Sequence, residues 1–592
     1  MTTDQTIIFS ILAATLVLFA WGKWRYDLVA LMAMTAVLLF KLVTPNEAFS
    51  GFGHTAVITV AAVLIISQAL KNAGVVDVVA AYLLPHTGNA IIHITLLTAL
   101  VTFFSAFMNN VGALALLLPV AIATAKEHNR SPAMILMPVA FGSILGGMST
   151  MIGTPPNIII ANYRADITGT AFGMFDFSPI GAVIATVGVL FITTIGWRLI
   201  PKQRFEENTA EELYEVSNYL TEVKVMQGSP LIELPVKEVE ALQGNDIGVV
   251  GIARGNRHAL NTNPNYVLKE NDILILRGDP ITLQKKFADA NLEFQTASGK
   301  TFDDLTSGDL TLTECVITAT SPIVGRDVAY LRRKTSNSVA VIGLAKEGRM
   351  IRKRLRNHSF KAGDVLLLQC EKAFVNDMLM ELNLLPLAER GIQIGQQRRV
   401  LIALTIFIGA ILLGAFHVLP MAGAFILAIL VYALMGFLPG KDVYRDVDWP
   451  IIILLGGMIP VGRALESTGA TDLIANQIVN LTNGLPIYLV LTLILVVTMF
   501  LSDIINNAAT ALVMAPISVG IANQLGVNID PFLMAVAIGA SCAFLTPIGH
   551  QSNTLVMGPG GYQFGDYWRM GLPLEILITV ISIPLILIVW PL

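Results

Sequence analysis

Two short stretches of sequence set the architecture of this chain: FSAFMNNVG at Phe104–Gly112 and LSDIINNAA at Leu501–Ala509. Each places an Asn-Asn pair inside apolar sequence, where an amide side chain is costly unless it finds hydrogen-bond partners. The apolar runs beside the first pair, Ile91–Phe104 and Gly112–Thr124, are each short for a full membrane span. Two half-helices that meet at a polar tip, a re-entrant hairpin, fit this pattern.

A glycine- and proline-rich motif follows each tip: GGMSTMIGTPPN at Gly146–Asn157 and AFLTPIGHQSN at Ala543–Asn553. Such residues break a helix inside an apolar segment and release backbone carbonyl groups. Interrupted segments at corresponding positions of two halves are a good sequence indicator of a transport site.

Both motif pairs belong to an internal repeat. A shift of 397 residues places Ser105 on Ser502, Asn109-Asn110 on Asn506-Asn507, Pro119 on Pro516 and Gly142 on Gly539. One residue less aligns Gly153 with Gly549 and Asn157 with Asn553. Generic membrane composition does not explain paired Asn-Asn dipeptides in register. The pattern indicates two related halves, as in many secondary transporters, and from the residues alone they could be inverted or parallel.

The charged residues are concentrated between these halves. Of 80 charged side chains, 52 lie in Lys202–Arg399, and several apolar runs outside this range are long enough to contribute membrane spans. A purely soluble enzyme, a secreted disulfide scaffold and a disordered chain are thereby excluded. The first apolar run, Thr6–Ala20, lacks a basic leader and a clear cleavage site, so we expect a retained helix.

Several classes of chemistry find no support in the sequence. Its three cysteines form no CxxC motif, so we expect neither a disulfide framework nor a zinc site, and no cofactor beyond coupling ions. No basic block suggests nucleic acid as a partner. No nucleophile is paired with a base, which argues against an enzyme.

The charged insert is itself duplicated, at a shift of 92 residues. Each copy opens with a short strand and a Ser-Pro turn, and further strands are predicted at Gly248–Ala253, Asp272–Arg277, Val339–Ala345 and Asp364–Cys370. We therefore predict a first membrane repeat at 1–201, an insert at 202–398 with α+β units at about 218–295 and 309–388, and a second membrane repeat at 399–592.

Basic residues give the orientation. Lys23 and Arg25 flank one loop, and Arg198, Lys202 and Arg204 lead into the insert. Since positive charge accumulates on the cytoplasmic side, we expect a multi-pass protein of the cell inner (plasma) membrane with its insert in the cytoplasm.

Two departures from the repeat are candidates for function. Asp503 is the one acid inside either tip motif, and it could set the cation stoichiometry, carry a proton or only cap the hairpin. His550-Gln551-Ser552 replaces Thr154-Pro155-Pro156. His550 could donate to an anion or stay neutral and hydrogen-bond its neighbours.

The tips, the Gly-Thr-Pro-Pro-Asn element and the segment Glu47–Phe52 resemble the divalent-anion/sodium symporter (DASS) family of the ion transporter superfamily. The insert resembles two TrkA C-terminal (RCK-C type) domains, with hallmark turns at Ala362–Val365 and, less well, Glu270–Ile273. The resemblance implies a polytopic α-helical protein of two inverted repeats with re-entrant hairpins and broken helices. It also implies a homodimer, an elevator motion and sodium coupling.

Site residues are implied by position in that family. The first sodium site would use Ser105, Asn109, Asn110 and Gly153, and the second Ser502, Asn506, Asn507 and Gly549. Substrate would contact Asn109, Asn110, Val111, Thr154, Asn506, Asn507, Ala508, His550 and Gln551. Dicarboxylate-carrying members have threonine where this chain has Val111 and Ala508, so the loss of those hydroxyls favours a compact inorganic dianion.

The sequence therefore predicts a sodium-coupled symporter of a divalent inorganic anion, sulfate first. The alternatives are a dicarboxylate carrier of the succinate type and a proton-coupled anion carrier. A channel would need a filter-like carbonyl motif such as TVGYG, which the sequence lacks, and a membrane sensor would need a signalling motif in the insert. The insert would regulate transport, through a small-molecule ligand or contacts between its units, or would stabilise a dimer.

Overall fold

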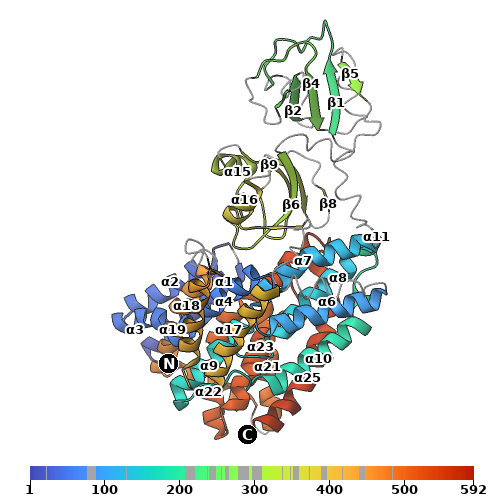
Figure 1. The fold of residues 1–592 in the computed structure, drawn as a ribbon. Helices are drawn as coiled ribbons and strands as arrows, with labels where there is room; N and C mark the ends of the chain where they lie inside the picture. Colours follow the sequence, from blue (N-terminus) through green and yellow to red (C-terminus); the bar gives the residue numbers. More distant parts are fainter. Residues whose placement is uncertain are drawn as a thin grey trace.

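The computed structural model covers the whole chain and describes all residues except 22, 76–88, 129, 207–219, 237, 239–247, 255–256, 260–265, 278–291, 296–309, 336–337, 347–348, 351–358, 372–373, 388–396, 417, 439–446 and 483–484. A body of helices carries two small β-sheet units stacked at one end (Figure 1). The C-terminus lies at the opposite end of this helical body.

The helices of the N-terminal block precede the β-sheet units in the chain. They are α1 (Thr3–Trp21), α2 (Tyr26–Leu39), α3 (Pro45–Ser50), η1 (Gly51–Gly53), α4 (Thr55–Asn72), α6 (Ala90–Ser105), α7 (Asn110–Glu127), α8 (Ala133–Gly147), α9 (Pro155–Thr168), α10 (Ser178–Thr194), η3 (Gly196–Leu199) and α11 (Gln203–Glu206).

The C-terminal block begins two residues before the predicted border at 399. It holds α17 (Gln397–Ala415), α18 (Met421–Leu434), α19 (Trp449–Ser467), α20 (Ala470–Leu481), α21 (Ile487–Ile504), α22 (Asn507–Leu525), α23 (Asp530–Ser541), α24 (Gln551–Met557), η8 (Phe564–Asp566) and α25 (Tyr567–Val589).

Seven helical segments among the described residues are long and apolar enough to cross a membrane. They are Thr3–Trp21, Pro45–Asn72, Arg398–Ala415, Trp449–Ser467, Ile487–Ile504, Asn507–Leu525 and Phe564–Val589. The helices beside the first tip are shorter, as the sequence predicted, whereas both helices beside the second tip reach spanning length. The protein is thus a polytopic helical membrane protein.

The two blocks interlock through their helices. In the N-terminal block α6 packs on α8, and in the C-terminal block α21 packs on α23. Between blocks, α2 packs against α19 and α4 against α18. The short helices after the glycine-rich motifs also cross over, since α9 contacts α22 and α23 while α24 contacts α7 and α8.

The insert forms two five-stranded antiparallel sheets with the same strand order. The first runs β3-β2-β4-β1-β5 and the second β8-β7-β9-β6-β10. The strands are β1 (Leu220–Val225), β2 (Gly248–Arg254), β3 (Arg257–Ala259), β4 (Ile273–Arg277), β5 (Leu292–Gln295), β6 (Leu310–Ile317), β7 (Ala340–Lys346), β8 (Arg349–Met350), β9 (Val365–Glu371) and β10 (Leu384–Pro386). Four of them match the predicted strands to within one residue at either end.

The likeness of the two sheets extends to their irregularities. The β2–β4 ladder shifts register between Val249 and Gly251, and the β7–β9 ladder does so 92 residues later, between Val341 and Gly343. In the second unit, α15 (Val328–Lys334) and α16 (Val375–Glu381) accompany the sheet, which has its own buried core.

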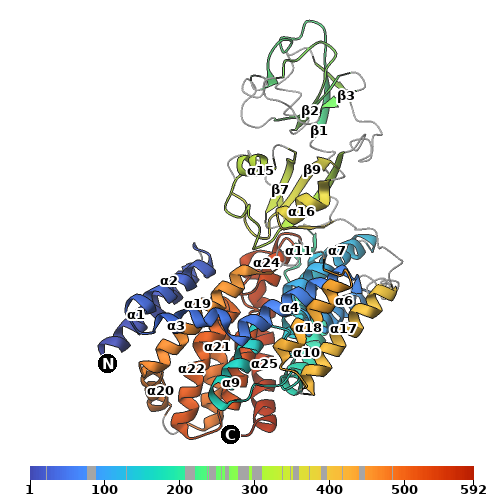
Figure 2. The same ribbon diagram turned by 60° about the vertical axis from the view of Figure 1, so that its left-hand side comes forward.

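The second sheet unit lies directly on the helical body, between it and the first unit (Figures 1 and 2). Val316, Ala345, Val365 and Leu387 of this unit belong to the same buried apolar cluster as the helices. Gly363, in the turn before β9, lies so close to α24 that a Cβ there would be 2.5 Å from the Thr554 carbonyl oxygen. The turn at Ala362–Val365, predicted as a hallmark of the second unit, is therefore where this unit contacts the helical body.

Candidate functional site

The first tip gathers one hydroxyl, one amide and two carbonyl groups between α6 and α7. Ser105, the last residue of α6, donates from Oγ to the Ser143 carbonyl oxygen at 2.6 Å. The Asn110 amide is best satisfied with its nitrogen toward Ser105 Oγ (2.8 Å), Ser143 O (3.2 Å) and Gly153 O (3.0 Å). The structure thus brings together three of the four residues predicted for the first sodium site.

The second tip brings together the corresponding residues, with the amide oxygen rather than the amide nitrogen toward the serine hydroxyl. Ser502 Oγ donates to the Ala540 carbonyl oxygen at 2.6 Å and lies 3.0 Å from the Asn507 side-chain oxygen. These residues are each 397 positions after Ser105, Ser143 and Asn110. A Cβ on Gly549 would lie 2.9 Å from the Ser502 carbonyl oxygen, so the predicted glycine also borders this cluster.

The first asparagine of each pair has a different role from the second. Asn109 Oδ1 accepts from Val111 N at 3.3 Å, and Asn506 Oδ1 accepts from Ala508 N at 2.9 Å. Both therefore cap the helix that follows, as short polar side chains do at a helix N-terminus. In the described contacts, the side chains of Asn109 and Asn506 face their own helices rather than the hydroxyl–amide clusters.

The glycine-rich segments are closed by asparagine side chains that bind freed carbonyl groups. Asn157 Nδ2 donates to Thr150 O at 2.9 Å. Asn553 Nδ2 donates to Ala543 O at 2.8 Å and to Thr546 O at 3.1 Å. These are the matching positions of the two halves, so in each half a side-chain amide of the same segment satisfies carbonyl groups that the helix break releases.

His550 joins the second glycine-rich motif to the first tip. Its Nδ1 accepts from Ser552 N at 3.0 Å, which leaves the proton on Nε2. That Nε2 lies 3.1 Å from the Asn110 amide, whose oxygen accepts in the satisfied orientation. Next to it, Ser143 Oγ donates to Ser552 Oγ at 3.1 Å. His550 is thus neutral in this geometry and spans from the second half to the first tip.

Thr154 occupies the position that matches His550. It precedes α9 as its N-cap residue, is 1% exposed, and its Oγ1 has no hydrogen-bond partner among the described residues. An unpaired hydroxyl buried to this degree costs free energy. Thr154 is therefore a predicted substrate residue whose buried hydroxyl makes no hydrogen bond within the described residues.

The structure adds one residue that sequence reasoning missed. Glu575, on α25, is 6% exposed and its Oε1 accepts from Phe544 N at 3.4 Å. Asp503, 3% exposed, accepts from Leu545 N at 2.9 Å in the same loop. Glu575 is an isolated acid in an apolar run, a signal that is visible in sequence but lies outside the tip motifs.

The ligand chemistry of the tips suits a hard cation. Hydroxyl, amide and carbonyl oxygens are typical ligands for such ions at broken membrane helices. No group of three or more His, Cys, Asp or Glu residues that could hold a metal ion is found in the described residues. Neither tip motif and neither glycine-rich motif contains Lys or Arg, so an anion there would meet helix N-termini and amide donors.

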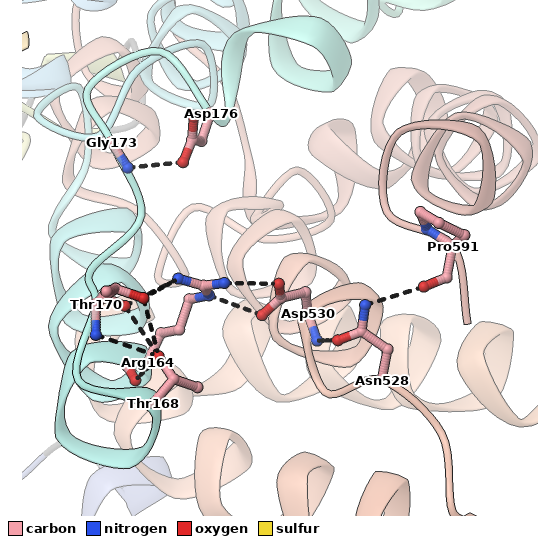
Figure 3. Close-up of polar contacts among 8 residues, drawn as sticks. All are labelled: Arg164, Thr168, Thr170, Gly173, Asp176, Asn528, Asp530 and Pro591. Carbon is pink, nitrogen blue, oxygen red and sulfur yellow. Dashed lines mark hydrogen bonds and ion pairs between the residues drawn. The ribbon is translucent and has the colours of Figure 1, made fainter.

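An ion pair links the halves at the end of α9. Arg164 donates from Nε and Nη2 to the two carboxylate oxygens of Asp530, at 2.8 and 2.9 Å, and from Nη1 to Thr170 O at 2.9 Å (Figure 3). Asn528 accepts from Asp530 N at 3.1 Å and donates to Pro591 O at 3.0 Å. The end of α9 is thereby fixed to the start of α23 and to the C-terminus.

The corresponding link at α24 is uncharged. Tyr562 donates to the Ala133 carbonyl oxygen at 2.6 Å and accepts from Met137 N at 2.9 Å. Ala133 begins α8 and lies 397 residues before Asp530. The first half therefore contacts α23 of the second half through Arg164, near the end of α9. The second half contacts α8 of the first half through Tyr562, which follows α24.

The sequence profile of the family described as "Citrate transporter" (CitMHS) matches residues 16–539 and 491–592. The "Uncharacterized transporter sll0640" of Synechocystis is 29% identical over 99% of this chain and 97% of its own length. The "Uncharacterized transporter YfbS" of Escherichia coli is 28% identical over 99% of each chain.

A more distant relative carries a substrate in its name. The "Probable sodium/sulfate cotransporter 3" of Chlamydomonas reinhardtii is 19% identical over 92% of this chain and 83% of its own length. The expectation of a membrane transporter in the ion transporter superfamily agrees with these matches. Because the two matched segments together span residues 16–592, the chain belongs to the citrate transporter (CitMHS) family.

Proposed function

We propose that the protein is a secondary active transporter that carries a divalent inorganic anion, sulfate first, together with sodium ions. The observation that carries the proposal is the pair of matching clusters, Ser105 with Asn110 and Ser502 with Asn507, each beside a broken helix. Each would hold one sodium ion with its hydroxyl and backbone carbonyl oxygen atoms. Gly153 and Gly549, which border the two clusters, would complete these two sites.

The anion would bind between the clusters. Helices α7 and α22 begin at Asn110 and Asn507, and their N-terminal N–H groups favour negative charge. Thr154 would contribute its spare hydroxyl, and the His550 and Gln551 side chains would complete the second half. Val111 and Ala508 offer no side-chain hydroxyl, and their backbone N–H groups already donate to Asn109 and Asn506. The lack of hydroxyl groups at these positions suits a compact oxyanion better than a long dicarboxylate.

Coupling to sodium follows from the charge of the substrate. Moving each negative charge into an inside-negative cell costs about 2.3 kcal/mol per 100 mV. Two sodium ions would cancel the charge of a dianion, and a third cation would make entry electrically favourable.

We further propose that the blocks are inverted repeats that move in an elevator mechanism within a homodimer, with the insert in the cytoplasm. The packing of α9 against α22 and α23, and of α24 against α7 and α8, supports one site-bearing body built from both blocks. Such a body could move as a unit past the remaining helices.

Radiolabelled sulfate uptake into proteoliposomes tests the proposal. Uptake should follow an imposed sodium gradient and stop when potassium replaces sodium. Uptake driven by a proton gradient without sodium would refute sodium as the coupling ion and support the proton-coupled alternative.

A carboxylate is the second candidate substrate, because the family description names citrate. Citrate and succinate should each be tested as competitors of sulfate uptake. Stronger competition by either carboxylate than by unlabelled sulfate would establish the carboxylate reading and refute sulfate as the substrate.

For the insert, we propose two TrkA-C-like units that regulate transport through α24. The turn at Gly363 packs directly against Thr554 and Gly558. A Cβ on Gly558 would overlap the Gly363 carbonyl oxygen. This contact lies on the same short helix that follows His550. A ligand that alters the second unit would therefore act on the helix that carries the second half of the site.

Deletion of residues 205–397, with a short linker in their place, tests this role. A regulatory insert predicts altered uptake kinetics in a protein that keeps its oligomeric state. Unchanged kinetics would contradict regulation, and loss of the dimer would indicate that the insert stabilises it.

A further inference from the structure

Matching residues of the two glycine-rich motifs differ in their exposure. In the second motif, the Ile548 side chain is 69% exposed and Thr546 is partly exposed. Their counterparts 396 residues earlier, Ile152 and Thr150, are 2% and 3% exposed. The repeat therefore places the same two residue types in opposite environments.

At the tips the difference is reversed. Val111 and Gly112 of the first tip are partly exposed, and a Cβ on Gly112 would meet no atom within 4 Å. Their counterparts, Ala508 and Ala509, are 2% and 0% exposed. The accessible surface is thus shared by the first tip and the second glycine-rich motif, which His550 joins.

This accessible surface lies on the insert side of the helical body. The second glycine-rich motif leads directly into α24, and the second unit of the insert packs on Thr554 and Gly558 of that helix (Figure 2). The first glycine-rich motif, buried over Ser149–Thr154, leads into α9, which lies farther from the insert (Figure 2). The proposed site is therefore accessible toward the insert and covered on the side of α9.

Two side-chain contacts hold the end of α9 on helices outside the site-bearing body. Tyr163 donates from its hydroxyl to Glu466 Oε1 on α19. His54, the N-cap residue of α4, accepts from Ala56 N through Nδ1, so its Nε2 carries the proton and donates to Asp166 Oδ2 at 3.0 Å. Because Tyr163 and Asp166 are three residues apart, they lie on one face of α9.

The helices that receive these contacts are joined to one another. Near the end of α19, Arg463 donates to Ser50 Oγ of α3 at 2.9 Å, and the Thr468 carbonyl oxygen accepts from Gln5 of α1 at 3.0 Å. Helix α4 also packs against α19. The two contacts therefore join the site-bearing body to a separate group of helices, whereas Arg164 binds α23 within the body.

The second half has different residues at the corresponding positions. Pro559 matches Tyr163, and Tyr562 matches Asp166. Pro559 has no hydrogen-bond donor, and the Tyr562 hydroxyl bonds to α8 within the body. The repeat does not require the contacts of α9, so their presence on the covered side indicates a function there.

We infer that Tyr163–Glu466 and His54–Asp166 form a latch that holds the site-bearing body in the conformation accessible toward the insert. Access from the opposite side would move α9 relative to α4 and α19, so both contacts would break. Because the blocks are repeats, Ile152 would then take the exposed environment that Ile548 has here. This movement rests on the proposed function, whereas the exposure of the two isoleucine positions can be measured without transport.

Cysteine labelling of the purified protein with a water-soluble maleimide tests the latch. The three native cysteines are buried, so an introduced cysteine gives the main signal. Ile548→Cys should react rapidly, whereas Ile152→Cys should react slowly, at a rate set by the population of the opposite conformation. Adding Tyr163→Phe or Asp166→Asn should raise the rate of Ile152→Cys by roughly 2- to 10-fold, because each removes one hydrogen bond of the latch.

The matched control is Thr168→Ala, which removes hydroxyl contacts within the end of α9 and its following turn. It should leave the labelling rate of Ile152→Cys unchanged. An unchanged rate in both latch variants would overturn the inference, as would rapid labelling of Ile152→Cys with the latch intact. A parallel rise in labelling of the native, buried Cys542 would also overturn it, because it would show general loosening of the fold.

A reversible cross-link tests whether the latch opens during transport. In the double variant Y163C/E466C, a cleavable bifunctional thiol reagent should abolish sodium-driven sulfate uptake, and reduction of the cross-link should restore it. Uptake that continues through the cross-link would refute the latch. Absence of sulfate uptake in the wild type, together with the expected labelling rates, would refute only the proposed function.

Discussion

Substitution of Gly363 by alanine separates docking of the insert from its folding. Gly363 has φ +86°, a backbone conformation that costs a residue with a Cβ about 1–2 kcal/mol. Its new Cβ would also lie 2.5 Å from the Thr554 carbonyl oxygen, and overpacking of this kind costs about 1–3 kcal/mol.

The same unit supplies a matched control at Gly325. This residue has φ +75°, but a Cβ there would meet no atom within 4 Å. Gly325→Ala should therefore carry the backbone cost alone. The two variants should therefore differ by about 1–3 kcal/mol in the free energy of docking the insert on α24. This difference corresponds to a shift of roughly 5- to 150-fold in the equilibrium between docked and undocked states.

Hydrogen exchange in the peptide covering Gln551–Gly560 measures that shift. Exchange in this segment should accelerate in Gly363→Ala and remain near the wild-type rate in Gly325→Ala, and sulfate uptake should change in the first variant only. Equal exchange in both variants would refute the docking contact, and accelerated exchange with unchanged uptake would refute its regulatory role.

Three further predictions concern the site, the link between halves and the insert. Asn110→Ala and Asn507→Ala should each weaken the sodium dependence of uptake by roughly tenfold or more, since each loses an amide that contacts a buried hydroxyl; wild-type sodium activation in both would show that the ions bind elsewhere. Removing either partner of the Arg164–Asp530 pair should destabilise the protein by about 1–3 kcal/mol, discounted for partial exposure, in a double-mutant cycle followed by thermal unfolding; additive effects would deny the coupling. Burial raises the pKa of the Cys315 thiol, so its thiolate fraction at neutral pH falls and alkylation should be slow in the native insert, faster at higher pH and rapid after unfolding; labelling at the rate of a free cysteine would contradict that burial.

Local sequence patterns predicted much of this architecture. The strands near Gly248 and Val339 follow from alternating β-branched and apolar residues, and the breaks at both tips follow from asparagine and glycine in apolar sequence. These features depend on residues that are neighbours in the chain, so local sequence patterns can predict them.

Contacts between distant segments could not be read in this way. The bridge from His550 to Asn110 depends on how α24 crosses to the other half, which no local periodicity encodes. Glu575 was missed for the same reason: the Phe544 N–H group that it accepts lies 31 residues away, and only the packing of α25 against the loop before α24 brings them together. The seating of Gly363 on α24 likewise depends on the placement of the whole insert.

Each block packs its short helix, α9 or α24, against helices of the other block, and this has a consequence for biogenesis. While the ribosome is still making the insert, α9 has no α22 or α23 to cover it, because those helices follow some 340 residues later. The N-terminal block therefore stays in the bilayer with part of its interior uncovered until the second block is made. Contacts between segments so far apart in the chain slow assembly and leave partly folded intermediates exposed. Coexpression of two separate halves should rescue function only if they meet in the same membrane, and a lone N-terminal half should be a substrate for membrane proteases.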